Sequence, residues 1–155
     1  MDIKLQHIDI KSNKNAELLY ELWQLSYAVE ADWIEVDYKL FPPLQRTPKD
    51  FLNSKNAFFI YLDHGLLVAC LEIKELSDSL RIQSCLVHPD WIRKGIGKQL
   101  MSFVFDKYSD KRNFSVETGA KNKPAIALYK KIGFSIVGIY RTSEILKVKM
   151  IKKAP

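Results

Sequence analysis

Residues 80–100 have the sequence Leu80-Arg-Ile-Gln-Ser-Cys-Leu-Val-His-Pro89-Asp-Trp-Ile-Arg-Lys-Gly-Ile-Gly-Lys-Gln-Leu100. The apolar spacing at the start of this stretch predicts a buried strand, and Pro89 ends it because proline cannot donate a ladder hydrogen bond. A turn with two glycines and several cations follows, and apolar residues then recur at helical spacing as far as Tyr108. The stretch therefore predicts a strand, a basic glycine-containing turn and a helix.

This turn predicts an anion site. Gly95 and Gly97 let a ligand approach the main chain, and the N–H groups of a first helical turn are unpaired donors at the positive end of the helix dipole. The flanking cations Arg93, Lys94 and Lys98 favour phosphate as the ligand. The glycine spacing fits neither the G-x-G-x-x-G pattern of dinucleotide folds nor the G-x-x-x-x-G-K-[ST] pattern of nucleotide-triphosphate loops.

The glycine stretch resembles the acetyl-CoA motif of the GNAT superfamily of N-acetyltransferases, V-x-P-x-x-(Q/R)-x-x-G-x-(G/A)-x-x-L. The motif is matched at Val87, Pro89, Gly95, Gly97 and Leu100, whereas Ile92 occupies the position of the family's Gln or Arg. A second family pattern, N-x-x-A-x-x-L-Y-x-x-x-G-F, is matched at Asn122, Ala125, Leu128, Tyr129, Gly133 and Phe134. The two motifs stand in the family's order, so the resemblance covers residues 80–134.

The resemblance implies an α/β (α+β) acyl-CoA N-acyltransferase fold in one domain, residues 1–155. Such a fold has a mixed, mostly antiparallel sheet with a splayed central pair of parallel strands, flanked by helices. The residues themselves predict that strands 80–87 and 114–118 run parallel, because a strand-helix-strand unit is almost always right-handed and parallel. Other patterns predict a strand at 3–10, a helix capped by Asn13 or Asn15, a short helix from Pro48 to Leu52, hairpins at 57–73 and 134–151, and a helix opened by Pro124 and ended by Gly133.

The same resemblance implies a cosubstrate, acetyl-CoA, and direct transfer of its acetyl group to a primary amine of a small molecule or peptide. Main-chain groups of Cys85, Leu86 and Val87 would then contact the pantetheine arm and the thioester. The turn would hold the phosphates, and Asn122 would contact the cofactor while also capping a helix. The turn residues implied as cofactor-binding are Arg93, Lys94, Gly95, Ile96, Gly97 and Lys98.

Catalysis of this reaction requires a proton acceptor for the amine and a proton donor for the departing thiolate. By resemblance, Tyr129 is the expected acid, which would ionise near pH 10. Glu117 is the expected base, because it resembles the glutamate of members that acetylate ribosomal-protein N-termini. Glu72 and an ordered water compete for this role, since Gln83 stands where many relatives carry a glutamate and cannot accept a proton.

Charge is distributed unevenly along the chain. The net charge is +6, and residues from Asp90 onward contain 15 Lys and Arg against five Asp and Glu. We expect no nucleic-acid partner, because the cations near the turn suit CoA phosphates and no aromatic residues interleave with the cations as in a base-stacking surface. An acidic segment predicts a cationic acceptor, with Trp33 and Tyr38 available for cation–π contacts; its carboxylates are Glu30, Asp32, Glu35 and Asp37.

Composition sets further expectations. With 155 residues, 47% of them hydrophobic, the chain can bury one core. No apolar run is long enough for a membrane span or signal core, so we expect a cytoplasmic protein without a membrane partner. Cys70, Cys85 and the three scattered histidines show no ligand spacing, so no metal is expected. A monomer and a homodimer stay open, as does an alternative function as a CoA-binding sensor or interaction module without efficient catalysis, to which Ile92 and Gln83 lend weight.

Overall fold

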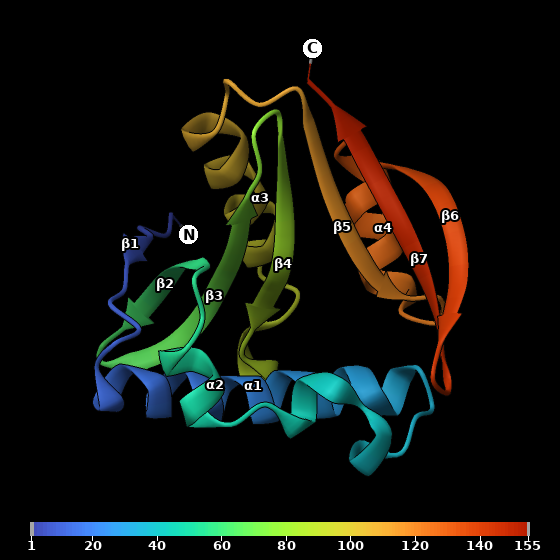
Figure 1. Cartoon of the computed structure of the whole chain (residues 1–155). Helices are drawn as coiled ribbons and strands as arrows, with labels where there is room; N and C mark the ends of the chain where they lie inside the picture. Colours follow the sequence, from blue (N-terminus) through green and yellow to red (C-terminus); the bar gives the residue numbers. More distant parts are fainter. Residues whose placement is uncertain (1, 155) are drawn as a thin grey trace.

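The computed structural model describes residues 2–154, which form a seven-stranded sheet with helices on both faces (Figure 1). The strand order is β1-β2-β3-β4-β5-β7-β6. The strands are β1 (Gln6–His7), β2 (Ala57–Asp63), β3 (Leu66–Glu75), β4 (Ser79–Val87), β5 (Asn113–Gly119), β6 (Ser135–Thr142) and β7 (Ile145–Lys153). The α-helices are α1 (Asn13–Trp33), α2 (Pro48–Leu52), α3 (Ile96–Lys107) and α4 (Lys123–Lys131), and the 3-10 helices are η1 (Tyr38–Leu40), η2 (Pro42–Gln45) and η3 (Pro89–Trp91).

The first strand is shorter than predicted. Ile3 and Leu5 pack against one core cluster, whereas Ile8 and Ile10 are buried in the other. The N–H of Ile3 donates to the side-chain oxygen of Gln99, at 2.9 Å, so α3 contacts the main chain at the start of this segment. The pairing of β1 with β2 is confined to Gln6 and His7.

The cap of α1 also differs from the prediction. Ser12 is the N-cap, and its side chain accepts a hydrogen bond from the N–H of Asn15. The side chain of Asn15 donates instead to the carbonyl of Asp9, at 2.8 Å. The other helix ends are as expected: Thr47 caps α2 with Pro48 at its first position, and Gly133 follows α4 with a φ of 107°.

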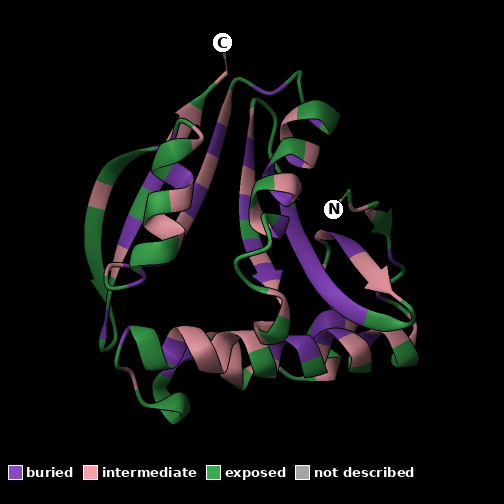
Figure 2. Cartoon of the chain, turned by 180° about the vertical axis from the view of Figure 1, so that it is seen from behind, coloured by how far each residue is buried: buried purple, intermediate pink, exposed green. Residues whose placement is uncertain are grey.

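Strand β3 lies at the centre of the core, because both of its faces are covered. Residues 67–73 are all buried, and Figure 2 shows the strand buried along most of its length. Cys70 packs with α1 and α2, whereas its neighbours Ala69 and Leu71 pack with α3. The two helical layers therefore lie on opposite faces of the sheet, which explains the nearly continuous apolar run in the sequence.

The central parallel strands diverge, as predicted. Strand β4 pairs with β5 only from Ser79 to Ile82, opposite Asn113 to Val116. Beyond this point β5 keeps its pairing with β7 as far as Gly119, and β4 keeps its pairing with β3 as far as Val87. The two strands separate towards α1, which crosses the open end of the fork (Figure 1). None of the helices in residues 2–154 has the length and apolar character needed to cross a bilayer.

Candidate active site

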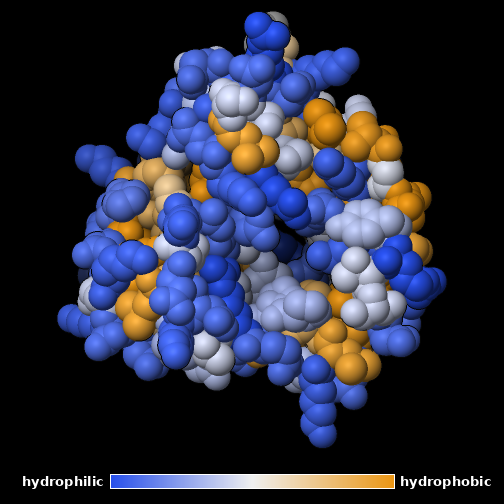
Figure 3. Space-filling view, viewed as in Figure 1, coloured by the Kyte–Doolittle hydropathy of each residue, from blue (hydrophilic) through white to orange (hydrophobic). Residues whose placement is uncertain are grey.

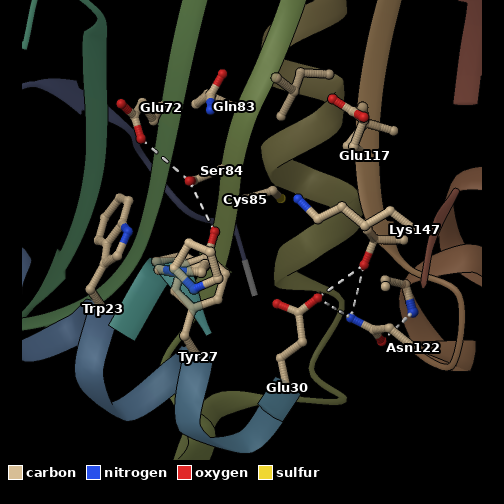
Figure 4. Close-up of a pocket in the computed structure, with 18 of the residues that line it drawn as sticks. Trp23, Tyr27, Glu30, Glu72, Gln83, Ser84, Cys85, Glu117, Asn122 and Lys147 are labelled. Atoms are coloured by element: carbon tan, nitrogen blue, oxygen red, sulfur yellow. Dashed lines mark hydrogen bonds between the residues drawn. The ribbon is translucent and has the colours of Figure 1, made fainter. Parts of the chain in front are cut away.

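A cavity of about 380 Å³ occupies the fork between β4 and β5. Helix α1 and the segment 41–46 close it on one side, and α4 contributes Ala125 and Tyr129. The space-filling view shows a hollow surrounded largely by hydrophilic residues (Figure 3). The polar and aromatic lining residues are Trp23, Tyr27, Glu30, Phe41, Arg46, Glu72, Arg81, Gln83, Ser84, Cys85, Glu117, Thr118, Asn122, Tyr129 and Lys147 (Figure 4).

Tyr129 and Cys85 meet in this cavity from α4 and β4. The tyrosine is only 6% exposed, and its hydroxyl lies near enough to the Cys85 thiol for the two groups to interact electrostatically. Burial, together with nearby groups that include Glu30, raises the pKa of Tyr129 well above 10. Burial also raises the pKa of Cys85 to about 12. Both groups are therefore protonated at neutral pH, so the phenol can donate a proton and the thiol is not a nucleophile.

Glu117 lies on the other arm of the fork, as predicted, but both of its carboxylate oxygens are engaged. Oε2 accepts a hydrogen bond from the Arg81 guanidinium and Oε1 accepts one from the Tyr140 hydroxyl. The bond to Glu117 raises the pKa of Tyr140. Because Arg81 is on β4 and Glu117 on β5, the ion pair spans the fork where the main-chain pairing ends.

Glu72, the competing base candidate, is more fully enclosed. It is 1% exposed, and Arg46 binds it through two contacts, Nη1–Oε1 at 2.6 Å and Nη2–Oε2 at 2.9 Å. Asn56 and Ser84 donate to the same carboxylate at 2.8 and 3.3 Å. The Arg46 guanidinium also stacks on Phe51, 4.2 Å from the ring centroid. These contacts give Glu72 a structural role, because they hold the segment 41–46 against the sheet.

Glu30 is a cavity carboxylate that we did not consider as a base from the sequence. Its Oε1 accepts hydrogen bonds from the Thr118 hydroxyl at 3.1 Å and from the Asn122 amide at 3.0 Å, so it ties α1 to the end of β5 (Figure 4). Its spacing from Trp23 and Tyr27, at i, i+4 and i+7, places the three side chains on one helix face. This helical spacing is the sequence signal that places Glu30 beside the two aromatic residues of the cavity.

Asn122 performs the capping role expected of it. Its Oδ1 accepts a hydrogen bond from the N–H of Ala125 at 3.3 Å, which caps α4. Its amide group donates to Glu30 and to Thr118. The residue lines the fork cavity, and its contact with the cofactor stays a prediction.

Of the four acidic residues predicted near the acceptor, only Glu30 lines the fork cavity. Asp32 accepts a hydrogen bond from the Tyr38 hydroxyl at 2.8 Å, and Glu35 pairs with Lys121 at 2.9 Å. Neither carboxylate lines the fork cavity, nor does Asp37, which caps the 3-10 helix η1. Asp32 follows Glu30 by two residues on α1 and therefore lies on another face of the helix. The chain turns sharply after Trp33, where Glu35 has a φ of 58°. Trp33 itself lines a second cavity.

This second cavity, of about 340 Å³, lies beside the glycine turn. Arg93 and Gly95 have left-handed backbone conformations, with φ of 64° and 76°. Helix α3 has no side-chain cap, and its first paired N–H is that of Gln99, which bonds to the Gly95 carbonyl at 3.2 Å. The N–H groups of residues 96–98 precede that bond, as the predicted phosphate cradle requires. The lining comprises Trp33, Val87, Trp91, Ile92, Arg93, Gly95, Ile96, Gly97, Lys98, Pro124, Ala125 and Leu128.

Gly97 has a packing role that the sequence did not reveal. A Cβ at this position would lie 3.1 Å from Cδ2 of Leu128, so the glycine permits the close approach of α3 and α4. Lys94, another predicted phosphate ligand, is not among the lining residues and lies over Trp91, 5.4 Å from the ring centroid.

Strand β4 connects the two cavities. Cys85 and Leu86 line the fork cavity, Val87 lines the second, and the edge of β4 that faces β5 has no partner strand after Ile82. The carbonyl of Val87 accepts a hydrogen bond from the Ser26 hydroxyl at 3.0 Å, which fixes this end of the strand to α1. The geometry thus offers a phosphate-compatible turn, an open strand edge and a cavity containing a protonated phenol and carboxylates.

The family profile for the acetyltransferase (GNAT) family matches residues 16–134. The chain is 33% identical over 130 residues to the UPF0157 protein YqkA of Bacillus subtilis strain 168. The matched region covers 82% of this chain but only 37% of that protein. It is 30% identical over 131 residues to the peptidyl-lysine N-acetyltransferase YiaC of Escherichia coli K12, covering 83% and 84% of the two chains. Its fold is similar to the ribosomal-protein-S18-alanine N-acetyltransferase of Escherichia coli, with a TM-score of 0.75, 20% identity, and coverage of 97% and 93%.

Proposed function

The chain belongs to the acetyltransferase (GNAT) family. We propose that it is an acetyl-CoA-dependent acyltransferase that acetylates a primary amine of a peptide or small molecule bound in the fork cavity. The observation that carries this proposal is that Tyr129, Cys85 and Glu117 line one cavity where the strands diverge. YiaC, a peptidyl-lysine acetyltransferase, supports an amine acceptor.

In this proposal the glycine turn binds the CoA phosphates, and the open edge of β4 binds the pantetheine arm. The free N–H groups at the start of α3 and the nearby Arg93 and Lys98 suit the negative charge of a pyrophosphate. The arm would run along residues 85–87, from the second cavity to the fork cavity, so that the thioester lies in the fork cavity.

The amine lone pair attacks the thioester carbon, the carbon–sulfur bond breaks, and the Tyr129 hydroxyl gives its proton to the departing thiolate. Burial of Tyr129 supports this role, because it keeps the phenol protonated. Glu117 accepts the proton of the attacking amine, through a water molecule because Arg81 and Tyr140 engage its oxygens. The four hydrogen bonds to Glu72 favour Glu117 over it.

The test is acetyl-CoA turnover with a panel of amines and peptides, measured as thiol release and confirmed by the mass of the acetylated product. Glu117→Gln, Glu72→Gln and Glu30→Gln distinguish the carboxylates. We expect Glu117→Gln to lower turnover about 10²-fold, with partial recovery at high pH. Tight binding of acetyl-CoA with no turnover on any amine would overturn the proposal and favour a CoA-binding module.

A further inference from the structure

The fork cavity contains three carboxylates and three cations, and two cations are already neutralised. Arg46 binds Glu72 through two contacts, and Arg81 binds Glu117. The remaining pair is Glu30 on α1 and Lys147 on β7. The charge that a ligand meets in this cavity therefore depends on those two residues.

Lys147 is the cavity cation that has no partner among the described residues. It is half-buried and lies opposite Gly119, the last residue of β5. Figure 4 shows its side chain extending into the cavity towards Cys85. Among residues 2–154 its ammonium group has no hydrogen-bond or ion-pair partner, although three carboxylates line the same cavity. A half-buried ammonium without a counter-ion favours an anionic ligand, because burial strengthens the interaction between charges.

Glu30 lies on the opposite wall and is bound only by neutral donors. Thr118 and Asn122 share its Oε1, and no cation pairs with it among the described residues. It is therefore placed to attract the ammonium form of an amine before that amine loses its proton. Because Glu30 and Lys147 do not pair with each other, the cavity presents two opposite charges on separate walls.

We propose that Lys147 binds a carboxylate of the acceptor, so that the preferred acceptor carries a carboxylate a few bonds from the amine that is acetylated. This inference rests on the proposed function and specifies its substrate class. It modifies the expectation of a purely cationic acceptor: the amine faces Glu30, the carboxylate faces Lys147, and the acceptor is zwitterionic. The carboxylate can belong to a free amino acid or to an acidic residue next to the acetylated residue of a peptide.

The experiment compares acceptors that differ only in this carboxylate. L-alanine against L-alaninamide and L-lysine against L-lysinamide represent free amino acids, and Ala-Asp-amide against Ala-Asn-amide represents peptides. The readout is kcat/KM for each acceptor, and the ratio within a pair measures the carboxylate preference. Dividing the wild-type ratio by that of a variant cancels the intrinsic difference in amine pKa between the two members of a pair.

We expect Lys147→Met to reduce this ratio about 10- to 100-fold in at least one series, mainly through KM, because a charge-assisted hydrogen bond is lost. Lys147→Glu should invert the preference towards the amide. The matched control is Lys149→Met, because Lys149 lies two residues along the same strand, is exposed and is not part of the cavity lining. The series that responds identifies the source of the carboxylate.

Two results would overturn the inference while leaving the proposed function intact. One is turnover with equal ratios in the wild type and in folded Lys147→Met and Lys147→Gln variants. The other is an equal fall in kcat/KM for both members of every pair, which indicates a structural role for Lys147. Failure of the wild type to acetylate any amine is a different outcome, because it contradicts the proposed function itself.

Discussion

Replacing Tyr129 with phenylalanine tests the proposed chemistry most directly, because the change removes one buried hydroxyl and little else. The hydroxyl interacts with the Cys85 thiol, and sulfur is a weak hydrogen-bond partner. Losing an interaction of this kind costs about 1 kcal/mol or less in the free energy of unfolding. The ring of Tyr129 packs on Phe134, with centroids 5.6 Å apart, and phenylalanine keeps that contact. We therefore expect a folded variant.

The expected loss of activity is much larger. General acid catalysis typically contributes about 10²- to 10⁴-fold, or about 2.7 to 5.4 kcal/mol in activation free energy at about 1.36 kcal/mol per tenfold. The assay is thiol release at saturating acetyl-CoA, together with calorimetric titration of acetyl-CoA. We expect Tyr129→Phe to lower kcat by at least 10²-fold without a change in affinity for acetyl-CoA.

The pH dependence supplies a second measurement. An unperturbed tyrosine would ionise near pH 10, and the rate would then fall because the acid is lost. Because burial raises the pKa of Tyr129 well above 10, its protonated form persists beyond that pH, and the fall should move to higher pH. The structure thus changes the expectation from the sequence, and the wild-type rate should not fall at pH 10.

Tyr108→Phe is the control, because Tyr108 is also buried but lies at the end of α3, away from the cavity. It should retain full activity. The reasoning would be refuted if folded Tyr129→Phe kept kcat within threefold of the wild type, since Tyr129 would then not be the acid.

Arg46→Met should lower the free energy of unfolding by about 3 to 5 kcal/mol in urea titration, because it leaves the Glu72 carboxylate buried without its cation; a loss below about 1 kcal/mol would contradict this. Gly97→Val should lower acetyl-CoA affinity tenfold or more in calorimetry and destabilise the fold by about 1 to 3 kcal/mol, because its side chain meets Leu128. Adding Leu128→Ala should recover stability, and no recovery would argue against that contact. Acetyl-CoA binding should change tryptophan fluorescence, and Trp33→Leu should reduce the change because Trp33 lines the turn cavity; an undiminished signal would place the ligand elsewhere.

The arrangement of the sheet was predictable because its signals are local. The strand end before Pro89 depends on proline, which cannot donate a ladder hydrogen bond, whereas the turns at Gly65 and Gly133 depend on glycine, which readily adopts positive φ. The parallel pairing of β4 with β5 follows from the handedness of the connection. The exception is β1, where the alternation predicted a strand over residues 3–10 and only Gln6 and His7 pair with β2.

The cavity was predictable only in part, because its contacts join segments far apart in the chain. The resemblance pointed to Tyr129 and Glu117, and both line one cavity, whereas their catalytic roles stay predictions. No pattern indicated that Arg81 and Tyr140 would engage Glu117, since those bonds depend on strand register across the fork. The unpaired state of the Lys147 side chain was equally hidden, because lysine on a strand is usually solvated and the cavity that it lines is built from several other elements.

The divergence of β4 and β5 removes main-chain hydrogen bonds, and side chains replace part of that connection. Past Ile82 the strands share no ladder, yet Arg81 holds Glu117 across the fork. On the other side Tyr27 bonds to Ser84 at 3.0 Å, and Glu30 bonds to the end of β5, so α1 is fixed to both arms. An open cavity lined by fixed dipoles and charges is suited to catalysis, because the groups need little reorganisation when charge develops in the transition state. The same contacts that keep the fork open therefore also orient its polar groups, so changing one of them should alter turnover as well as stability.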